Sequence, residues 1–142
     1  MRFLLLFILL STSLQAKTFK DFTLPVFNSS KRFNLDKALK EKKVLLNFWA
    51  SWCTSCIQEL PELRELKEKY GDDVVFVAIN AGEKRFKIKK FLDKYDFPYF
   101  ILVDKNKELP KSVGVLSLPQ TFVIGEGREI LYKGDRPPKK ID

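Results

Sequence analysis

The chain has 142 residues, of which 45% are hydrophobic, 26 are Lys or Arg, 18 are Asp or Glu, two are Cys and none is His. This length and composition suit one globular domain. The lack of His excludes a Ser-His-Asp triad, a His-ligated haem and a zinc finger with two His ligands, and two Cys cannot build a four-thiolate metal site. Any chemistry must therefore come from Cys, Asp, Glu, Lys, Tyr or a bound metal.

The first 16 residues have the pattern of a secretory signal peptide, with a positive charge, the apolar run 3–10, a polar stretch and the small residue Ala16. The apolar run is much shorter than the roughly 20 residues of a membrane-spanning helix. Leu14 is larger than the small residue preferred three positions before a cleavage site, so cleavage after Ala16 is favoured but an uncleaved tether to the inner membrane stays open. We expect residues 17–142 to form a single periplasmic or otherwise extracytoplasmic domain, where paired Cys normally oxidise.

The segment after this signal is a lead-in to the main domain. Short edge strands are predicted at residues 22–25 and 31–33, on either side of a turn at residues 28–30. Asn34 is expected to cap a short helix from Leu35, because an Asn side chain can accept a hydrogen bond from a free N–H group of the first turn. The sequence therefore predicts an N-terminal β-hairpin extension.

Five further strands are predicted. Residues 44–50, 74–80 and 99–103 are nearly continuous apolar runs, which is typical of strands buried on both faces of a parallel sheet. Residues 121–124 and 129–132 flank a glycine-containing turn and should form an antiparallel hairpin. The fold class is therefore α/β, with a central mixed β-sheet flanked by helices.

Two amphipathic helices are predicted between the apolar strands. The first runs through residues 53–70, where apolar side chains recur at helical spacing, and Pro61 should kink it because proline has no N–H group. The second has an apolar stripe at Ile88, Phe91, Leu92 and Tyr95. Both helices should bury one face against the sheet.

The motif that carries chemistry is Trp-Cys-Thr-Ser-Cys at residues 52–56, just after the first central strand and at the start of the first helix. Helical spacing of i and i+3 brings Cys53 and Cys56 within disulfide range, so the pair can open and close without a change of fold. The free N–H groups of the helix start should stabilise a Cys53 thiolate and lower the pKa of this thiol below that of a free cysteine. We therefore predict Cys53 as the nucleophile and Cys56 as the resolving thiol.

Two cysteines at this spacing can also serve other functions. An inert structural disulfide is disfavoured because so short a loop constrains the unfolded chain little. Haem attachment would need His after Cys56, where Ile57 stands. Soft-metal binding stays open, and its best form is a Cu(I) metallochaperone holding copper between the two thiolates, although the only Met lies in the signal and no His can add a ligand.

The run Asn-Phe-Trp-Ala-Ser-Trp-Cys-Thr-Ser-Cys at residues 47–56, with Pro61 after it, resembles thioredoxin-like proteins. It is most similar to the exported TlpA/ResA type of thiol-disulfide oxidoreductase, over about residues 22–132. This resemblance implies a thioredoxin fold, which normally ends in a helix that covers one sheet face. Residues 134–142 are short, charged and proline-rich, so this C-terminal helix should be missing, with a partner over the open face or a shortened domain.

The resemblance also assigns roles to single residues. Leu118 and Pro119 match the cis-proline loop, which with Trp52 would bind an extended substrate segment beside the Cys pair. Glu83 resembles the acidic residue that exported members use for proton transfer; the alternative is a solvated carboxylate at a helix start. Asn47 stands where cytosolic thioredoxins have a buried Asp and cannot titrate, which makes Glu83 the better acid–base candidate.

The function that the resemblance implies is disulfide exchange with proteins of the cell envelope. Reduction is the expected direction, with a membrane protein as electron donor and apocytochromes c as one substrate class. No cofactor, metal or nucleic acid is expected. Residues 84–90 carry five positive charges, which indicate a solvated helix face or an attraction to acidic partners or anionic membranes.

Overall fold

The computed structural model describes residues 17–97 and 99–142, and its centre is a five-stranded mixed sheet. The predicted signal, residues 1–16, lies outside the described residues. The sheet order is β5-β4-β3-β6-β7, with β3, β4 and β5 parallel and β6 and β7 antiparallel to their neighbours. Its strands are β3 (Lys43–Trp49), β4 (Val74–Asn80), β5 (Phe100–Val103), β6 (Gln120–Ile124) and β7 (Ile130–Gly134). The mixed sheet that the sequence predicted is confirmed.

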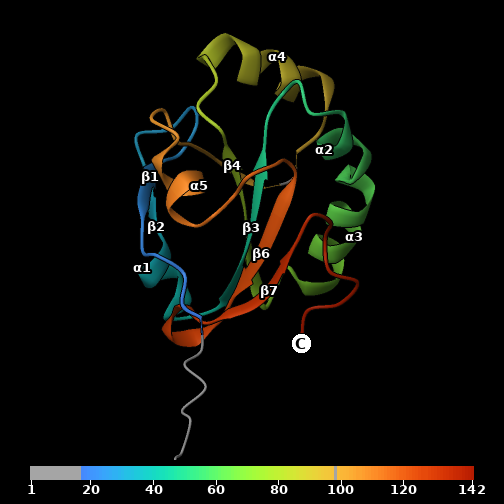
Figure 1. The fold of residues 1–142 in the computed structure, drawn as a ribbon. Coiled ribbons are helices and arrows are strands. Elements are labelled where there is room, and N and C mark those ends of the chain that lie inside the picture. The colour runs from blue at the N-terminus through green and yellow to red at the C-terminus, as the bar shows by residue number, and fades with distance from the viewer. Residues whose placement is uncertain (1–16, 98) are drawn as a thin grey trace, which may run out of the picture.

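Helices cover both faces of this sheet (Figure 1). The first face carries α2 (Thr54–Gln58), α3 (Leu60–Tyr70) and α4 (Arg85–Lys94), and the second carries α1 (Leu35–Leu39) and α5 (Glu108–Ser112). Alternate side chains of β3 enter the two core clusters: Leu45 and Trp49 face the first, and Leu46 and Phe48 face the second. The continuous apolar run of β3 thus reflects burial on both sides.

The lead-in forms the predicted hairpin and helix. β1 (Thr23–Pro25) and β2 (Arg32–Asn34) pair antiparallel in a separate two-stranded sheet, and Val26 bridges to Leu102 of β5. Asn34 caps α1, because its Oδ1 accepts a hydrogen bond from the N–H of Lys37 at 2.8 Å. The hairpin therefore extends the edge of the main sheet beside β5.

The helix predicted for residues 53–70 is two helices, not one kinked helix. It divides at Glu59, which ends α2 and precedes α3. The physical reason is Pro61, which stands in the first turn of α3 and has no N–H group to continue the hydrogen-bond ladder of α2. α5 was not predicted: it has only five residues and contains Pro110, so it lacks a readable periodicity.

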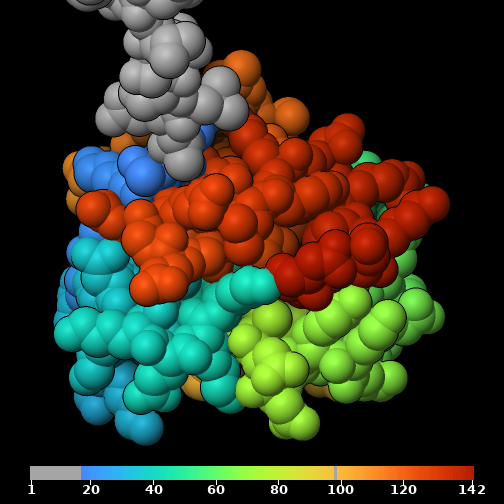
Figure 2. Space-filling model, turned by 90° about the horizontal axis from the view of Figure 1, so that it is seen from below, coloured from blue at the N-terminus to red at the C-terminus, as the bar shows by residue number. Residues whose placement is uncertain are grey.

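The C-terminal tail, defined as residues 135–142, forms no helix, as predicted. Its path runs beside α3 (Figures 1 and 2). Pro137 and Pro138 are buried, and Ile141 lies in the first core cluster. The tail therefore covers part of the face that we expected either a partner to cover or a shortened domain to leave open. Within residues 17–97 and 99–142, no helix is both long enough and apolar enough to cross a membrane.

Candidate active site

The two cysteines lie just beyond the carboxyl end of β3, where α2 begins. They form a disulfide, with their Cα atoms 5.3 Å apart, as the spacing of three residues predicted. Cys53 is the N-cap of α2, and its Sγ accepts a hydrogen bond from the N–H of Cys56 at 3.2 Å. The backbone therefore offers a donor to the sulfur that would carry negative charge after reduction.

The two cysteines are both buried, but they occupy different positions on α2. Cys53 is 4% exposed and Cys56 is 1% exposed, and both belong to the first core cluster. Cys53 stands at the open end of α2 beside Trp52, whereas Cys56 is one turn further in. Cys53 is therefore the cysteine at the open end of the helix.

The proline loop lies against this pair. The Leu118–Pro119 peptide bond is cis, as the resemblance implied, and Pro119 is buried directly before β6. β6 pairs with β3, and Gln120 stands opposite Phe48. The loop is therefore held at the same end of the sheet as the cysteines. Leu118 packs against the cluster that contains both sulfurs. The structure thus brings together Cys53, Cys56, Leu118 and Pro119.

Glu83 lies near the Cys pair but is held by the backbone that leads to it. Its carboxylate accepts hydrogen bonds from the N–H of Ser51 at 2.7 Å, from Ser51 Oγ at 2.5 Å and from Asn80 Nδ2 at 2.9 Å. Partial burial works against the ionised form, but these hydrogen bonds outweigh it and place the pKa of Glu83 below its ordinary value. Glu83 is therefore ionised at neutral pH.

A second carboxyl, which the sequence analysis missed, is buried on the other side of the pair. Glu59 ends α2, three residues after Cys56, and is 2% exposed. Burial is the main cause that raises its pKa to about 7, although the hydrogen bond from Asn47 lowers it in part. Its spacing from Cys56 and Leu63 places it on the buried stripe of the predicted helix, and that was the available signal.

Glu59 is hydrogen-bonded to Asn47, whose side-chain amide also contacts the neighbouring strand β6. Asn47 of β3 and Thr121 of β6 stand opposite each other in the sheet, and Asn47 Nδ2 donates to Glu59 Oε1 at 2.7 Å and to Thr121 Oγ1 at 3.2 Å. Asn47 Oδ1 and Glu59 Oε2 are buried without a hydrogen-bond partner among the described residues. Of these two oxygens only Glu59 Oε2 belongs to a group that titrates, and the amide oxygen of Asn47 can only accept a hydrogen bond.

A cavity of about 250 Å³ leads to this carboxyl. It is bounded by α2, the proline loop and the start of the C-terminal tail, and its lining includes Ser55, Glu59, Pro119, Asp135 and Arg136. A polar cavity of this size holds water molecules. Glu59 therefore borders a polar cavity beside the proline loop.

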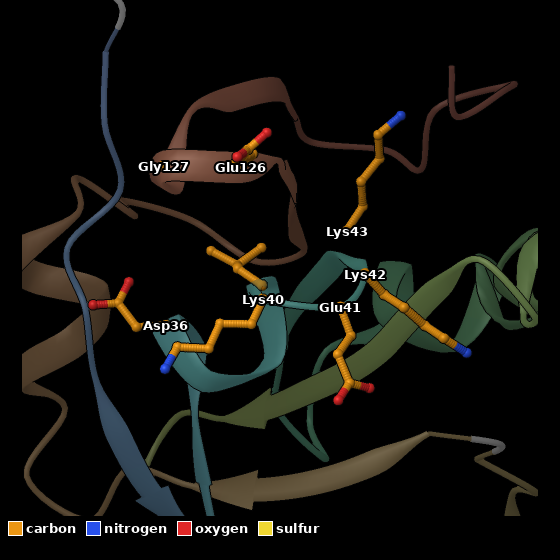
Figure 3. A pocket seen from close by; sticks show the side chains of 8 residues that line it. Asp36, Lys40, Glu41, Lys42, Lys43, Glu126 and Gly127 are labelled. Carbon is orange, nitrogen blue, oxygen red and sulfur yellow. The ribbon is translucent and has the colours of Figure 1, made fainter.

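Another hollow lies at the opposite end of the sheet. It measures about 610 Å³ and is lined by residues near α1, by Lys43 at the start of β3 and by the turn at Glu126 and Gly127 (Figure 3). Its lining carries charges of both signs, from Asp36 and Glu41 as well as Lys40. β3 separates it from the cysteines by its full length, so it takes no part in this site.

Comparisons with known proteins agree with this geometry. The model of the Redoxin family matches residues 14–141, and the chain therefore belongs to the Redoxin family. It is 40% identical over 109 residues to the thioredoxin-like protein YneN of Bacillus subtilis, covering 75% of this chain and 62% of that protein. It is 34% identical over 109 residues to the thiol-disulfide oxidoreductase ResA of Bacillus thuringiensis, covering 75% and 63% respectively. The chain thus spans less than two thirds of the length of these relatives.

A solved structure shows the same architecture. The exposed lipoprotein thioredoxin Etrx1 of Streptococcus pneumoniae superimposes with a TM-score of 0.69 at 30% identity, covering 81% of this chain and 88% of that one. The fold is therefore thioredoxin-like, with the β1–β2 hairpin as an additional two-stranded sheet. The likeness to the exported type that residues 47–56 indicated is confirmed.

Proposed function

We propose that the protein is a thiol-disulfide oxidoreductase that acts on other proteins outside the cytoplasm. The observation that carries this proposal is the Cys53–Cys56 disulfide at the start of α2, against the cis Leu118–Pro119 loop. The names of the relatives YneN and ResA support the same activity. Pro119 and Leu118 offer the docking edge for an extended client segment, and Trp52 flanks it.

The exchange proceeds in two balanced steps. In the reduced protein, the Cys53 thiolate attacks one sulfur of a client disulfide; the client S–S bond breaks, a Cys53–client disulfide forms, and one client sulfur leaves as a thiolate. Cys56 then loses its proton and attacks Cys53 Sγ, which reforms the Cys53–Cys56 disulfide and releases the second client sulfur. The client gains two electrons and the pair loses two.

Glu59 takes the proton of Cys56 in this account. The two residues are three positions apart at the end of α2 and so lie on one side of the helix. A carboxyl with a pKa of about 7 changes its protonation at the pH at which the exchange must work. Water in the adjoining cavity relays the proton to solvent.

Glu83 has a different part in this proposal. Its three hydrogen bonds tie Ser51 to Asn80 and fix the backbone that leads into Cys53. It acts as a positioning residue, because an ionised carboxylate with occupied oxygens is a weak proton acceptor. The proton-transfer role that the resemblance implied for Glu83 stays a prediction. The pH profile of the Glu83→Gln variant separates this role from positioning of the backbone.

The direction and location of the reaction are part of this proposal, and the predicted signal and the resemblance to the exported type support them. We place the protein in the periplasm or another extracytoplasmic space, as a reductase of envelope proteins that include apocytochromes c. Because clients would oxidise the pair in each cycle, an electron donor has to reduce it again, and we propose a membrane protein for this role. The signal at residues 1–16 would either be cleaved or tether the domain to the inner membrane.

Equilibration of the Cys53–Cys56 pair with glutathione and dithiothreitol buffers tests this proposal. A reductase requires a potential near that of thioredoxin, about −270 mV, so the pair should stay oxidised in buffers at about −200 mV. A potential near −120 mV would make the protein an oxidant instead. Tight one-to-one Cu(I) binding by the reduced protein, with negligible turnover of disulfides, would contradict the oxidoreductase function and favour the alternative, a Cu(I) metallochaperone.

A further inference from the structure

A groove of about 400 Å³ lies between α2 and α4, directly beside the reactive pair. Trp52 and Phe86 stand at its rim with 71% and 63% of their surfaces exposed, which is unusual for aromatic side chains. Ile57 and Phe91 line it as well, and both are more buried. The groove thus offers an apolar lining next to Cys53.

The same groove has a cationic wall. Lys87, Lys90 and Lys94 line it from α4 at spacings of three and four residues, which places their side chains in one row. Among the described residues that line the groove there is no Asp or Glu. By contrast, Lys89 lies outside the groove on the same helix, and it is paired with Asp93 at 2.7 Å. The positive charge of α4 is therefore concentrated toward Trp52.

We propose that this groove binds an acidic, extended segment of the client protein. This inference rests on the proposed oxidoreductase function and names the class of client that the site prefers. From Lys87 to Lys94 the helix rises about 10 Å, which matches roughly three residues of an extended chain. Such a segment would carry two or three Asp or Glu residues and one apolar side chain, a few residues from its reacting cysteine. Its carboxylates would pair with the lysines, and its apolar side chain would pack against the aromatic lining.

The shape of the groove favours a peptide over a membrane surface. Its lysines and aromatic residues line a hollow, whereas an anionic bilayer presents a flat surface that is met best by protruding groups. The hollow also adjoins Trp52, so a bilayer laid across it would cover Cys53 and block clients. A narrow acidic strand can occupy the groove while its cysteine reaches Cys53.

Two sets of synthetic peptides, each an acidic peptide and its neutral partner, test the proposal. Every peptide carries one cysteine as a mixed disulfide with 2-mercaptoethanol and a Leu within a flanking segment. The acidic peptide has three Asp or Glu residues in this segment, and the neutral peptide has Asn or Gln instead. The flanking segment is placed before the cysteine in one set and after it in another. The reduced protein should react with the acidic peptide of one set roughly tenfold faster than with its neutral partner, which three exposed charge pairs of ordinary strength can supply. This ratio should fall between 20 mM and 500 mM salt.

The groove variant Lys87→Gln, Lys90→Gln, Lys94→Gln should reduce the ratio to about twofold or less. A matched control, Lys40→Gln, Lys89→Gln, Lys111→Gln, removes the same net charge outside the groove and should keep the ratio. All six side chains are exposed, so neither variant should disturb folding. Wild-type turnover of the neutral disulfide of 2-mercaptoethanol tests the oxidoreductase function separately.

Equal rates with the acidic and the neutral peptide of both sets in wild type would overturn the proposal. An equal loss of the acidic-to-neutral rate ratio in the two variants would also overturn it, because the overall charge would then explain the preference. Vesicles with anionic phosphatidylglycerol give a third outcome. If the groove variant loses binding to them but keeps the peptide ratio, the surface binds membranes and the proposal is wrong. Turnover of the neutral disulfide with no peptide preference would leave the proposed function standing.

Discussion

The Cys56→Ala variant is expected to accumulate stable mixed disulfides between Cys53 and client proteins. Cys53 lies at the start of α2 with a backbone N–H group directed at its sulfur, and Cys56 is the more buried sulfur of the pair. Without Cys56, the first exchange step still occurs and the second cannot. Turnover should fall by about a thousandfold or more, because the residues of a covalent mechanism act as a unit. Non-reducing electrophoresis followed by mass spectrometry measures the trapped species.

The Cys53→Ala variant is the matched control. It removes a sulfur of the same disulfide and should lose turnover to the same extent, but it should trap no clients, since Cys56 is 1% exposed. Circular dichroism should show the same fold for both variants. Mixed disulfides formed through Cys56 in the Cys53→Ala variant would reverse the two roles.

The Glu59→Gln variant is expected to remove the inflection near pH 7 from the pH profile of the resolving step. In wild type, the rate at which Cys56 releases a trapped client should rise as pH passes about 7, where Glu59 loses its proton and becomes a base. Gln cannot accept this proton, so the resolving step at pH 8 should slow by about a hundredfold. Stopped-flow measurement of client release between pH 5 and pH 9 gives the profile.

Glu59 should also make the free energy of unfolding depend on pH. Its pKa in the folded protein, about 7, lies above its ordinary value of 4.5, so between these values the folded state holds a proton that the unfolded state has lost. Stability therefore falls as pH rises through this window. Glu59→Gln has no such loss. Its stability relative to wild type should be greater at pH 8 than at pH 4 by about 3 kcal/mol, measured by urea unfolding.

The Glu83→Gln variant separates positioning from proton transfer. Its amide would place a donor against Ser51 or Asn80, which are themselves donors, so the loop before Cys53 should loosen and exchange should slow at every pH. The inflection near pH 7 should stay. If Glu83→Gln removes this inflection and Glu59→Gln keeps it, the proton acceptor is Glu83 and the role that we give to Glu59 is wrong.

The elements that could be predicted from the sequence are those with a strong local pattern. β3 and β4 are apolar on every side because both faces of the sheet are covered, and this produces a run that no surface strand would show. The Cys pair was readable because its position after a buried strand and its spacing of three residues both reflect the start of α2. The N-cap role of Asn34 could be predicted because capping depends on one side chain and the first turn of the helix.

The features that could not be predicted depend on contacts between distant segments. The pKa of Glu59 is set by burial under residues of β3, β6 and the C-terminal tail, and by the hydrogen bond from Asn47, twelve residues away in the chain. The hydrogen bonds of Glu83 join it to Ser51, thirty-two residues earlier. The burial of Ile141 depends on the path of the tail, which has no periodic pattern. Local patterns placed the sulfurs, whereas tertiary contacts set the burial, the hydrogen bonds and the pKa of the two nearby carboxyls.

The rate at which the reduced protein reacts with iodoacetamide at each sulfur, followed by mass spectrometry from pH 5 to pH 9, tests the central claim most directly. A free cysteine ionises at about pH 8.5 and reacts slowly below it. We predict that Cys53 is alkylated first and keeps most of its rate at about pH 6.5, while Cys56 reacts far more slowly throughout. Two sulfurs that both react at the rate of a free cysteine across this range would contradict the account.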